Sequence, residues 1–397
     1  MTPLLVAALG FLSMGSAFAT DTYLPALPDI ALDLRTSPAL VQATLTVFVI
    51  AQAAGNLVIG PVSDRFGRWR PLLISTIVFV LASVGAALAQ DIWMLIAMRA
   101  VQGLASAAGP VIARAVVADL THGVQAARLF GILMMVFGIA PVIAPVIGGP
   151  LAELGGWRLA MGAIVALGVV GVLVALRLPE SLPRDRRRAV RLRSVFGDYT
   201  GLVRNRTFFA GSLVVMAAFG IIMTWLSNSS FVLQEHYGLS PTGYAVTFAA
   251  NSAGFGLAAM LNSALLRRFP PAAILRGTIF VSVAVTAAAL VLALVDALPL
   301  WTLLVLVTIA FGSTAPIMSN ATAVALAAVR PTEVGTASAF LGALEFLLPA
   351  IVAPMLGLFG SSPEPTAIGF FAYALLGLAL WARLRALPIR AQVSRGA

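Results

Sequence analysis

The stretch "GPVSDRFGRWRP", residues 60–71, interrupts a long apolar region with one acid and three arginines. It stands between the apolar runs 39–63 and 71–90. A helix needs about 20 predominantly apolar residues to cross a bilayer, and both runs are long enough. The stretch is therefore predicted to be the short polar turn that joins two membrane-spanning helices.

The residue types within this turn suit that position. Gly60 and Gly67 permit a sharp reversal and a close approach of two helices. Asp64 precedes the expected start of the following helix, where the helix dipole favours a carboxylate. Arg65 and Arg68 are expected at the cytoplasmic face. A charged turn with no further role would carry similar residues, but this spacing of glycine, aspartate and arginine is specific.

The composition of the whole chain indicates an all-α integral membrane protein. Of its 397 residues 60% are hydrophobic and 10% are charged, and the mean hydropathy is +1.00. Soluble domains are about 45–50% apolar and about 25% charged. The runs are too long for the roughly ten-residue strands of a membrane barrel. Twelve runs of spanning length are present, at 3–25, 39–63, 71–90, 92–118, 127–152, 157–178, 208–232, 241–266, 273–295, 299–326, 335–359 and 365–385.

Charge and cysteine content exclude several functions. The chain has no cysteine, and its histidines, His122 and His236, fall in predicted loops, so no thiolate, haem or buried metal site is expected. All 25 basic residues are arginine. With a cytoplasmic N-terminus, all of them except Arg35, Arg99 and Arg158 lie at cytoplasmic loops or helix ends. This bias sets membrane topology and favours contact with anionic lipid. It predicts two cytoplasmic termini and no nucleic-acid partner.

The segment "GSAFATDTYLPALPDI", residues 15–30, allows two interpretations. Its "AFA" triplet resembles a signal-peptidase site, which would place Asp21 near the start of a secreted protein. However, the preceding residues lack the basic region of a signal peptide. Cleavage would also put the arginine-rich loops on the wrong side of the membrane. The segment is therefore expected to remain as the first span, with Asp21 inside it.

A basic segment divides the chain into two halves. Residues 179–206 carry eight arginines and three acids, and they are expected to form a cytoplasmic linker. Six spans precede it (1–178) and six follow it (207–397). "APVIG" at 144–148 and "APMLG" at 353–357 stand at equivalent places in the two halves. This pattern favours a duplicated transporter with its binding site between the halves, near the middle of the membrane.

At these motifs the sequence resembles a known family. "GPVSDRFGRWRP" is similar to the loop signature of the major facilitator superfamily, and "MRAVQGLASAAGP" at 98–110 resembles its span-four motif. "DTYLPALP" at 21–28 and "PES" at 179–181 resemble twelve-span drug:proton antiporters. With "SSFVLQEHYGLSPT" at 229–242, the closest resemblance is to the Bcr/CflA drug-resistance group. "GIAPVIAPVIGGP" resembles the span-five antiporter motif, here carried by Gly138, Pro141, Pro145, Gly148 and Gly149.

The resemblance implies the major facilitator fold, with twelve helices in two six-helix halves, and proton-coupled export. It makes the loop of residues 60–71 a gating element. The equivalent loop of the second half, "LNSALLRRFPP", lacks the acid and the glycines. A latch built on the first half is therefore expected.

Two charged residues inside predicted spans are candidates for proton coupling. An aspartate at the centre of a membrane helix costs about 2.5–3.5 kcal/mol, so it is normally paired, hydrated or functional. Asp21 lies in the outer half of span one, where capping the helix end among lipid headgroups is the alternative role. Arg99 lies at a similar depth in span four and keeps its charge, so it needs a compensating partner. Asp21 is the expected partner, and Gln102 is expected to join them. A purely structural ion pair is the alternative, while the resemblance assigns the arginine to the proton pathway.

Glu345 is a second acid well inside a predicted span. It is a candidate protonation site or an anion that attracts cationic drugs, and a protonated glutamic acid bonded to a neighbouring helix is the alternative. Polar and aromatic side chains near mid-membrane are candidates for lining a substrate cavity, although the amides would equally serve hydrogen bonds between helices. These candidates are Tyr23, Gln52, Asn56, Gln102, Asn228, Phe231, Asn251 and Asn320.

We therefore predict a multidrug efflux transporter of the bacterial inner membrane. It is expected to export small hydrophobic or cationic drugs in exchange for protons, driven by the proton gradient without a cofactor. A proton-coupled uptake symporter for a sugar or organic acid is the alternative. An enzyme is disfavoured because the predicted spans contain no His, no Cys and no cluster of acids. An ATP-driven pump is excluded because no G-x-x-x-x-G-K-[ST] loop exists. The sequence gives no strong sign of an oligomer, so a monomer is expected.

Overall fold

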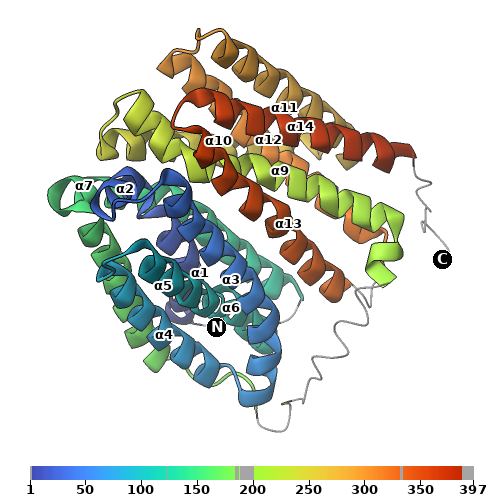
Figure 1. Cartoon of the computed structure of the whole chain (residues 1–397). Helices are drawn as coiled ribbons and strands as arrows, with labels where there is room; N and C mark the ends of the chain where they lie inside the picture. Colours follow the sequence, from blue (N-terminus) through green and yellow to red (C-terminus); the bar gives the residue numbers. More distant parts are fainter. Residues whose placement is uncertain (1, 122, 184–186, 188–200, 331–333, 387–397) are drawn as a thin grey trace, which may run out of the picture. The chain divides into compact units, whose positions relative to one another are not determined.

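The computed structural model describes residues 2–121, 123–183, 187, 201–330 and 334–386, and within these residues all regular structure is helical (Figure 1). Most of the predicted basic linker, residues 184–186 and 188–200, lies outside the described part, as does His122. The helices before the linker are α1 (Pro3–Asp21), η1 (Leu24–Ala26), α2 (Leu27–Asp33), α3 (Pro38–Phe66), α4 (Trp69–Ala87), α5 (Ile92–Ser106), α6 (Ala108–Leu120) and α7 (Gly123–Leu176). Those after it are α9 (Arg206–Phe231), η3 (Val232–His236), α10 (Pro241–Leu265), α11 (Pro271–Leu294), α12 (Leu300–Ala327), α13 (Val334–Leu356), η5 (Gly357–Phe359) and α14 (Pro363–Ala386).

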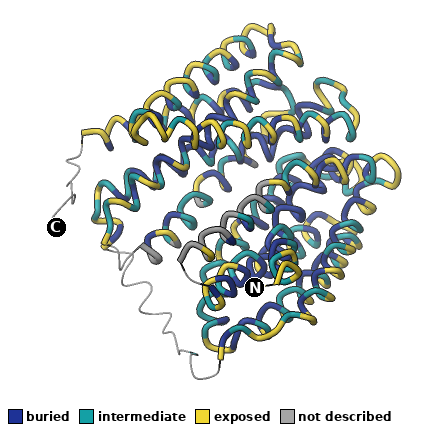
Figure 2. Tube along the Cα trace, turned by 180° about the vertical axis from the view of Figure 1, so that it is seen from behind, coloured by how far each residue is buried: buried dark blue, intermediate teal, exposed yellow. Residues whose placement is uncertain are grey.

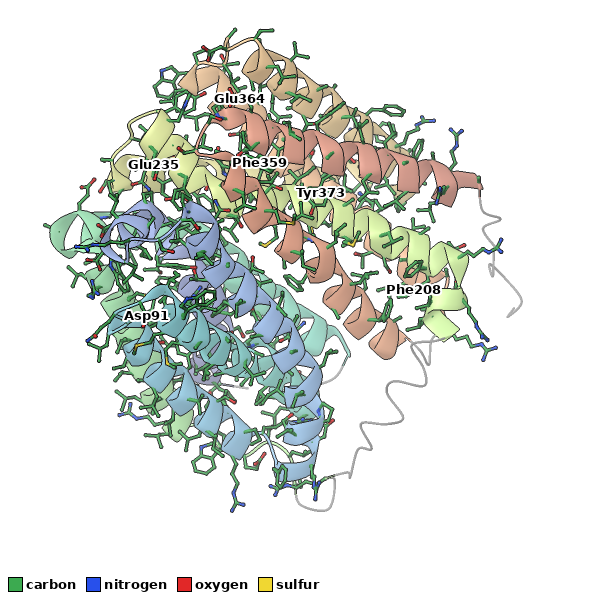
Figure 3. All side chains as sticks on the ribbon, in the orientation of Figure 1. Asp91, Phe208, Glu235, Phe359, Glu364 and Tyr373 are labelled. Atoms are coloured by element: carbon green, nitrogen blue, oxygen red, sulfur yellow. The ribbon has the colours of Figure 1, made fainter. Side chains whose placement is uncertain are left out.

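The helix ends follow local sequence chemistry. Ser37 caps α3 by accepting a hydrogen bond from the amide of Leu40, and Pro38 occupies the first helical position, where no amide hydrogen is needed. Asp91, labelled in Figure 3, caps α5 in the same way. It accepts hydrogen bonds from the amides of Trp93 and Met94 at 2.9 Å each. These caps place the ends of the spans where the apolar runs begin.

Helix α7 contains two predicted spans. At Gly155 and Gly156 its backbone is not helical, and Gly156 has φ +69°, a conformation that glycine adopts at little cost. The predicted spans 127–152 and 157–178 thus lie on the two sides of this break. By length and composition, eleven stretches of the described residues can cross a membrane, and one of them, Ile139–Leu176, includes the break. The twelve predicted runs all correspond to helices.

The helices form two compact units. The first unit comprises Met1–Val190, Leu226–Ser252 and Ala350–Ser362, and the second comprises Arg191–Trp225, Ala253–Pro349 and Pro363–Ala397. The ends of α9, α10 and α13 thus pack with the helices that precede the linker.

Each unit has its own apolar core. In the first unit, α1 packs against α7, α3 against α5, and α4 against both α5 and α7. Leu9, Leu72 and Ile112 are buried together in one cluster of this unit. In the second unit, α11 packs against α12 and α14, and Phe208 and Trp381 belong to one buried cluster. Buried positions recur along the helices and alternate with exposed ones (Figure 2), as expected for helices with one face in a bundle and another toward lipid.

Candidate transport site and loop network

Asp21 and Tyr23 lie where the first span breaks. Helix α1 ends at Asp21, and the short helix η1 follows with Pro25 inside it. The first span is thus not one continuous helix, since Pro25 and Pro28 follow the end of α1 and proline cannot donate a helical hydrogen bond. Asp21 is 4% exposed and Tyr23 is fully buried. The carboxyl group is therefore enclosed by protein rather than placed among headgroups, which disfavours the alternative role as a simple outer cap.

Arg99 is fully buried in α5 and lies close to this break. Its Nη1 donates to the carbonyl oxygen of Ala19 at 2.9 Å and to Oε1 of Gln102 at 2.5 Å. Its guanidinium carbon lies 4.3 Å from the ring centroids of both Tyr23 and Phe48, which is cation–π geometry. Aromatic faces and a backbone carbonyl thus provide much of the compensation for the buried cation.

The predicted ion pair between Asp21 and Arg99 is not formed. Among the described residues, no carboxylate oxygen lies within 4.0 Å of the Arg99 nitrogens, and its Nε and Nη2 make no hydrogen bond. The aromatic rings and the Ala19 carbonyl, which sequence spacing does not reveal, lie against the guanidinium in place of a carboxylate.

Further polar side chains extend from this site. Gln102 donates from Nε2 to the Ser83 hydroxyl on α4 at 2.6 Å, and the hydroxyl of Tyr23 lies 2.9 Å from that of Thr44 on α3. Ser83 and Thr44 were not predicted, and hydroxyl residues are too frequent in spans for sequence alone to single them out. We call the six residues together the first-half network, which consists of Asp21, Tyr23, Thr44, Ser83, Arg99 and Gln102.

Asn228 takes part in a contact between segments far apart in the sequence. Its Oδ1 accepts from Nε2 of Gln42 at 3.2 Å, and its Nδ2 lies 3.5 Å from the carbonyl oxygen of Ala353. Nearby in the sequence, Gln234 donates from Nε2 to the carbonyl oxygen of Pro25 at 2.8 Å. All of these residues belong to the first unit. Gln42 and Gln234 were not predicted as site residues.

The other residues predicted to line a substrate cavity do not form one cluster, and they belong to both units. Phe231 and Asn251 are buried in the first unit, and Gln52 and Asn56 on α3 are partly exposed. Asn320 belongs to the second unit and donates from Nδ2 to Oδ1 of Asn262 at 2.8 Å, so it serves a hydrogen bond between helices α12 and α10.

Glu345 lies in the middle of α13 and is partly exposed. It belongs to the second unit, whereas Asp21 and Arg99 belong to the first. The three predicted proton-coupling residues are thus not members of one packed cluster within either unit.

The glycines of the predicted span-five motif allow close packing of backbones. A Cβ atom at Gly148 would collide with the carbonyl oxygen of Thr22, directly after Asp21. At Gly149 it would lie 2.8 Å from the carbonyl oxygen of Pro241, at the start of α10. Pro141 and Pro145 lie inside α7, as does Gly138. The motif therefore brings α7 into direct contact with the chain break that carries Asp21.

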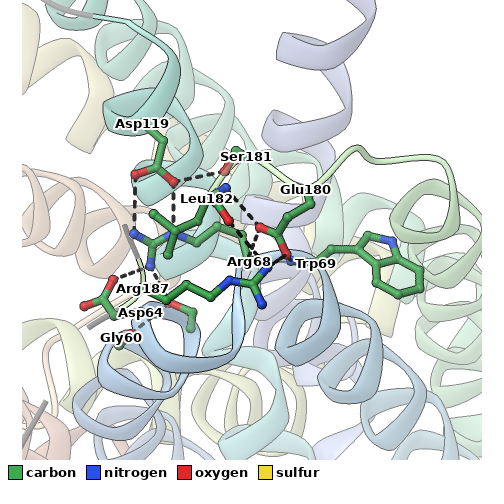
Figure 4. A network of polar contacts seen from close by, with 10 residues as sticks. Gly60, Asp64, Arg68, Trp69, Asp119, Glu180, Ser181, Leu182 and Arg187 are labelled. Carbon is green, nitrogen blue, oxygen red and sulfur yellow. Dashed lines mark hydrogen bonds and ion pairs between the residues drawn. The ribbon is translucent and has the colours of Figure 1, made fainter. Parts of the chain in front are cut away.

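The loop of residues 60–71 is the centre of a second polar network (Figure 4). Arg68 is 8% exposed and pairs with two acids: its Nη1 lies 2.5 Å from Oδ1 of Asp64, and its Nε lies 3.0 Å from Oδ2 of Asp119 at the end of α6. Ser181 also donates to Asp119, at 3.0 Å. Burial disfavours the charge of Arg68, but hydrogen bonds to the two carboxylates outweigh burial and raise its pKa above the ordinary value. The Arg68 side chain is therefore buried within the loop network, a role that its expected place at the cytoplasmic face did not indicate.

Glu180, rather than Asp64, is the carboxylate at the start of α4. Its Oε1 accepts from the amide of Arg68 at 2.8 Å and its Oε2 from the amide of Trp69 at 3.4 Å, while Arg187 lies 3.5 Å from Oε2 (Figure 4). The prediction for Asp64 was wrong because Asp64 lies in the last turn of α3 and faces the Arg68 side chain. A sequence signal existed: Glu180 directly follows the last span of the first half, on the same predicted membrane side.

The two glycines of the loop differ in role. Gly67 has φ +90°, which disfavours other residues, and a Cβ atom there would collide with Glu180. Gly60 lies within α3, and a Cβ atom there would meet no atom within 4 Å. The close approach expected at Gly60 is therefore absent. Arg65 is exposed and its guanidinium carbon lies 5.2 Å from the ring centroid of Phe66.

Comparison with known proteins agrees with this architecture. The model of the Major Facilitator Superfamily matches residues 9–354, and the chain belongs to this family. Over 376 residues it is 32% identical to the uncharacterized MFS-type transporter YdgK of Bacillus subtilis, covering 93% of this chain and 92% of YdgK. It is 29% identical to a bicyclomycin resistance protein homolog of Haemophilus influenzae over 89% of each chain.

Solved structures support the same fold. A bacterial homolog of the human lysosomal transporter Spinster matches with a TM-score of 0.76 over 97% of each chain, at 19% identity. The protein is thus a multi-pass membrane transporter of the major facilitator fold, not an enzyme, and its substrate is a small molecule.

Proposed function

We propose that this protein exports hydrophobic or cationic antibiotics from the bacterial cytoplasm in exchange for protons, within the Bcr/CflA group of drug:proton antiporters. The observation that carries the proposal is the burial of Asp21 beside Arg99 at a break in the first span. A carboxyl group enclosed in this way can bind and release a proton as its surroundings change. The resemblance to a bicyclomycin resistance protein homolog supports drugs as the substrates.

Proton binding would act through the charge of Arg99. The guanidinium keeps its charge at any ordinary pH and has two nitrogens without hydrogen bonds. An ionised Asp21 is attracted to it, whereas a protonated Asp21 is not. In the proposed cycle, protonation favours the cytoplasm-facing state, in which a drug replaces the proton. The contact between Gly148 and Thr22 would transmit movement of this break to α7.

The loop network would stabilise one state of the alternation. Arg68 is bound by acids from the ends of α3 and α6, and Glu180 connects the loop to the segment after α7. This supports a rigid cytoplasmic end of the first half, on which a latch to the second half would be built. An Asp64→Asn variant that transports normally and alternates normally would exclude the latch.

The test is drug-induced proton movement in everted membrane vesicles with an imposed pH gradient. The panel contains amphenicol, bicyclomycin-like and lipophilic cationic compounds. Wild type is compared with Asp21→Asn and Glu345→Gln, and Asp296→Asn serves as a control because Asp296 is an exposed acid outside the predicted sites. We expect a compound that collapses the gradient in wild type and in the control but not in Asp21→Asn.

Two results would contradict the proposal. If Asp21→Asn behaves like wild type while Glu345→Gln is inactive, proton coupling belongs to α13 rather than to Asp21. If no compound moves protons but a sugar or organic acid enters vesicles together with protons, the protein is an uptake symporter.

A further inference from the structure

Helix α10 begins in contact with helix α7, although the linker separates the two helices in the sequence. A Cβ atom at Gly149 of α7 would lie 2.8 Å from the carbonyl oxygen of Pro241 and 2.8 Å from Cβ of Ala245. One turn further along α7, Oε1 of Glu153 accepts a hydrogen bond from the amide of Thr242 at 3.0 Å. We call these five residues the α7–α10 junction, and all of them belong to the first unit.

Glu153 completes the capping of α10. The first amides of a helix have no partner within the helix. Pro241, at the first position, has no amide hydrogen, and Ser240 accepts from the amide of Gly243 at 3.1 Å. The amide of Thr242 is thus left for a partner outside α10, and a carboxylate suits this place because the helix dipole favours negative charge there. The cap of α10 is therefore completed by a helix from the other side of the linker.

The α7–α10 junction differs from two other contacts that join segments across the linker at the Asp21 end of the first unit. Gln42 and Asn228, which bond to each other, are both buried, and Gln234 donates to the buried carbonyl group of Pro25. Glu153, in contrast, is exposed. Water can therefore replace its hydrogen bond when the junction opens, so this bond breaks at a lower cost than the buried amide contacts.

The α7–α10 junction is also connected to the chain break that carries Asp21. Gly148 directly precedes Gly149 and contacts the carbonyl oxygen of Thr22. The same turn of α7 thus touches the break with one glycine and α10 with the next. Because packed protein interiors are hardly compressible, a displacement of the break reaches the start of α10 through these contacts.

We propose that Glu153 is a latch residue for transport. Its carboxylate holds the start of α10 on α7 in the observed arrangement, and it releases α10 when the segments on the two sides of the linker separate at this end of the first unit. This role requires neither a particular drug nor proton coupling, so it is independent of the proposed function.

The first measurement uses a pair of introduced cysteines. The chain has no cysteine of its own, so spin labels attach only where cysteines are placed. Leu88→Cys, directly after α4, and Val246→Cys, in α10, are suitable because the two side chains are 64% and 59% exposed. Double electron–electron resonance in lipid nanodiscs measures the distance between the labels. In Glu153→Ala we expect the ratio of the longer-distance to the shorter-distance population to rise about tenfold, the typical effect of losing a helix cap.

Two variants serve as controls. Glu153→Gln keeps an oxygen that can accept from the Thr242 amide, so it should retain the wild-type distances. Asp33→Ala removes another acid from the same end of the unit. Because Asp33 accepts from Nε1 of Trp157 at 2.9 Å and thus joins only segments that precede the linker, this variant should also match wild type. An unchanged distance distribution in Glu153→Ala, or an equal shift in Asp33→Ala, would overturn the latch.

The second measurement separates a latch from a local helix cap. Glu235, labelled in Figure 3, is exposed on η3 and follows Gln234, whose contact with Pro25 does not involve Glu153. With labels at Leu88→Cys and Glu235→Cys, we expect Glu153→Ala to increase the longer-distance population again, since only residues 237–240 separate η3 from α10. An unchanged distribution for this pair would mean that Glu153 caps α10 only locally, which would contradict the proposal.

Discussion

Replacing Glu180 with alanine is expected to loosen the start of α4. The first amides of a helix have no partner within the helix, so their protection from solvent depends on a cap. Glu180 provides that cap from a distant part of the sequence, through hydrogen bonds of 2.8 Å to the amide of Arg68 and 3.4 Å to that of Trp69. In Glu180→Ala both amides lose their acceptor.

The expected magnitude follows from these contacts. Loss of a helix cap costs about 0.5–2 kcal/mol, and a carboxylate at a helix N-terminus contributes about 0.3–1 kcal/mol. The Glu180 side chain is 31% exposed, so solvent reduces the part that depends on its charge. We therefore expect local opening to become easier by about 1.4 kcal/mol, which is a factor of about ten. Glu180→Gln keeps an oxygen acceptor and should show a smaller effect.

The assay is hydrogen–deuterium exchange of the amides of Arg68 and Trp69 in nanodiscs. Both should exchange about ten times faster in Glu180→Ala. Asp64→Asn is the matched control, since Asp64 contacts the Arg68 side chain but neither amide. Unchanged exchange in Glu180→Ala would refute the cap. An equal effect of Asp64→Asn would mean that the whole loop network, rather than Glu180, orders the start of α4.

Two further substitutions test the packing and the buried charge. Gly148→Ala should destabilise the protein by about 1–3 kcal/mol, because its Cβ would collide with the Thr22 carbonyl. The control Gly162→Ala should leave the melting temperature unchanged, since a Cβ there meets no atom within 4 Å. Equal melting temperatures of the two variants would contradict the contact between Gly148 and Thr22. Gln102→Leu should cost about 1–3 kcal/mol because Arg99 loses an acceptor. Thermal unfolding followed by tryptophan fluorescence measures this cost, and an unchanged transition would mean that Arg99 is otherwise compensated.

Much of the fold and part of the site could be predicted from the sequence. All twelve predicted runs are helical, because length and apolar composition determine whether a segment can cross a bilayer. Asp21 and Arg99 were recognised as unusual for the same reason, and both are buried. That Asp21 and Arg99 form no direct ion pair was not predictable, because the position of a guanidinium depends on neighbours from three helices. Tyr23 and Phe48 stack on Arg99, although no sequence pattern connects them.

The sequence by itself determined which stretches are long and apolar enough to cross a membrane, the polar turns between them and the presence of charges inside spans. These properties depend on local composition and on the cost of placing polar groups in lipid. Only the tertiary structure decided which carboxylate caps α4, which groups surround Arg99, and that Gly148 contacts Thr22. Each of these contacts joins residues distant in the sequence, and a difference of a few ångströms in helix packing would change the partners.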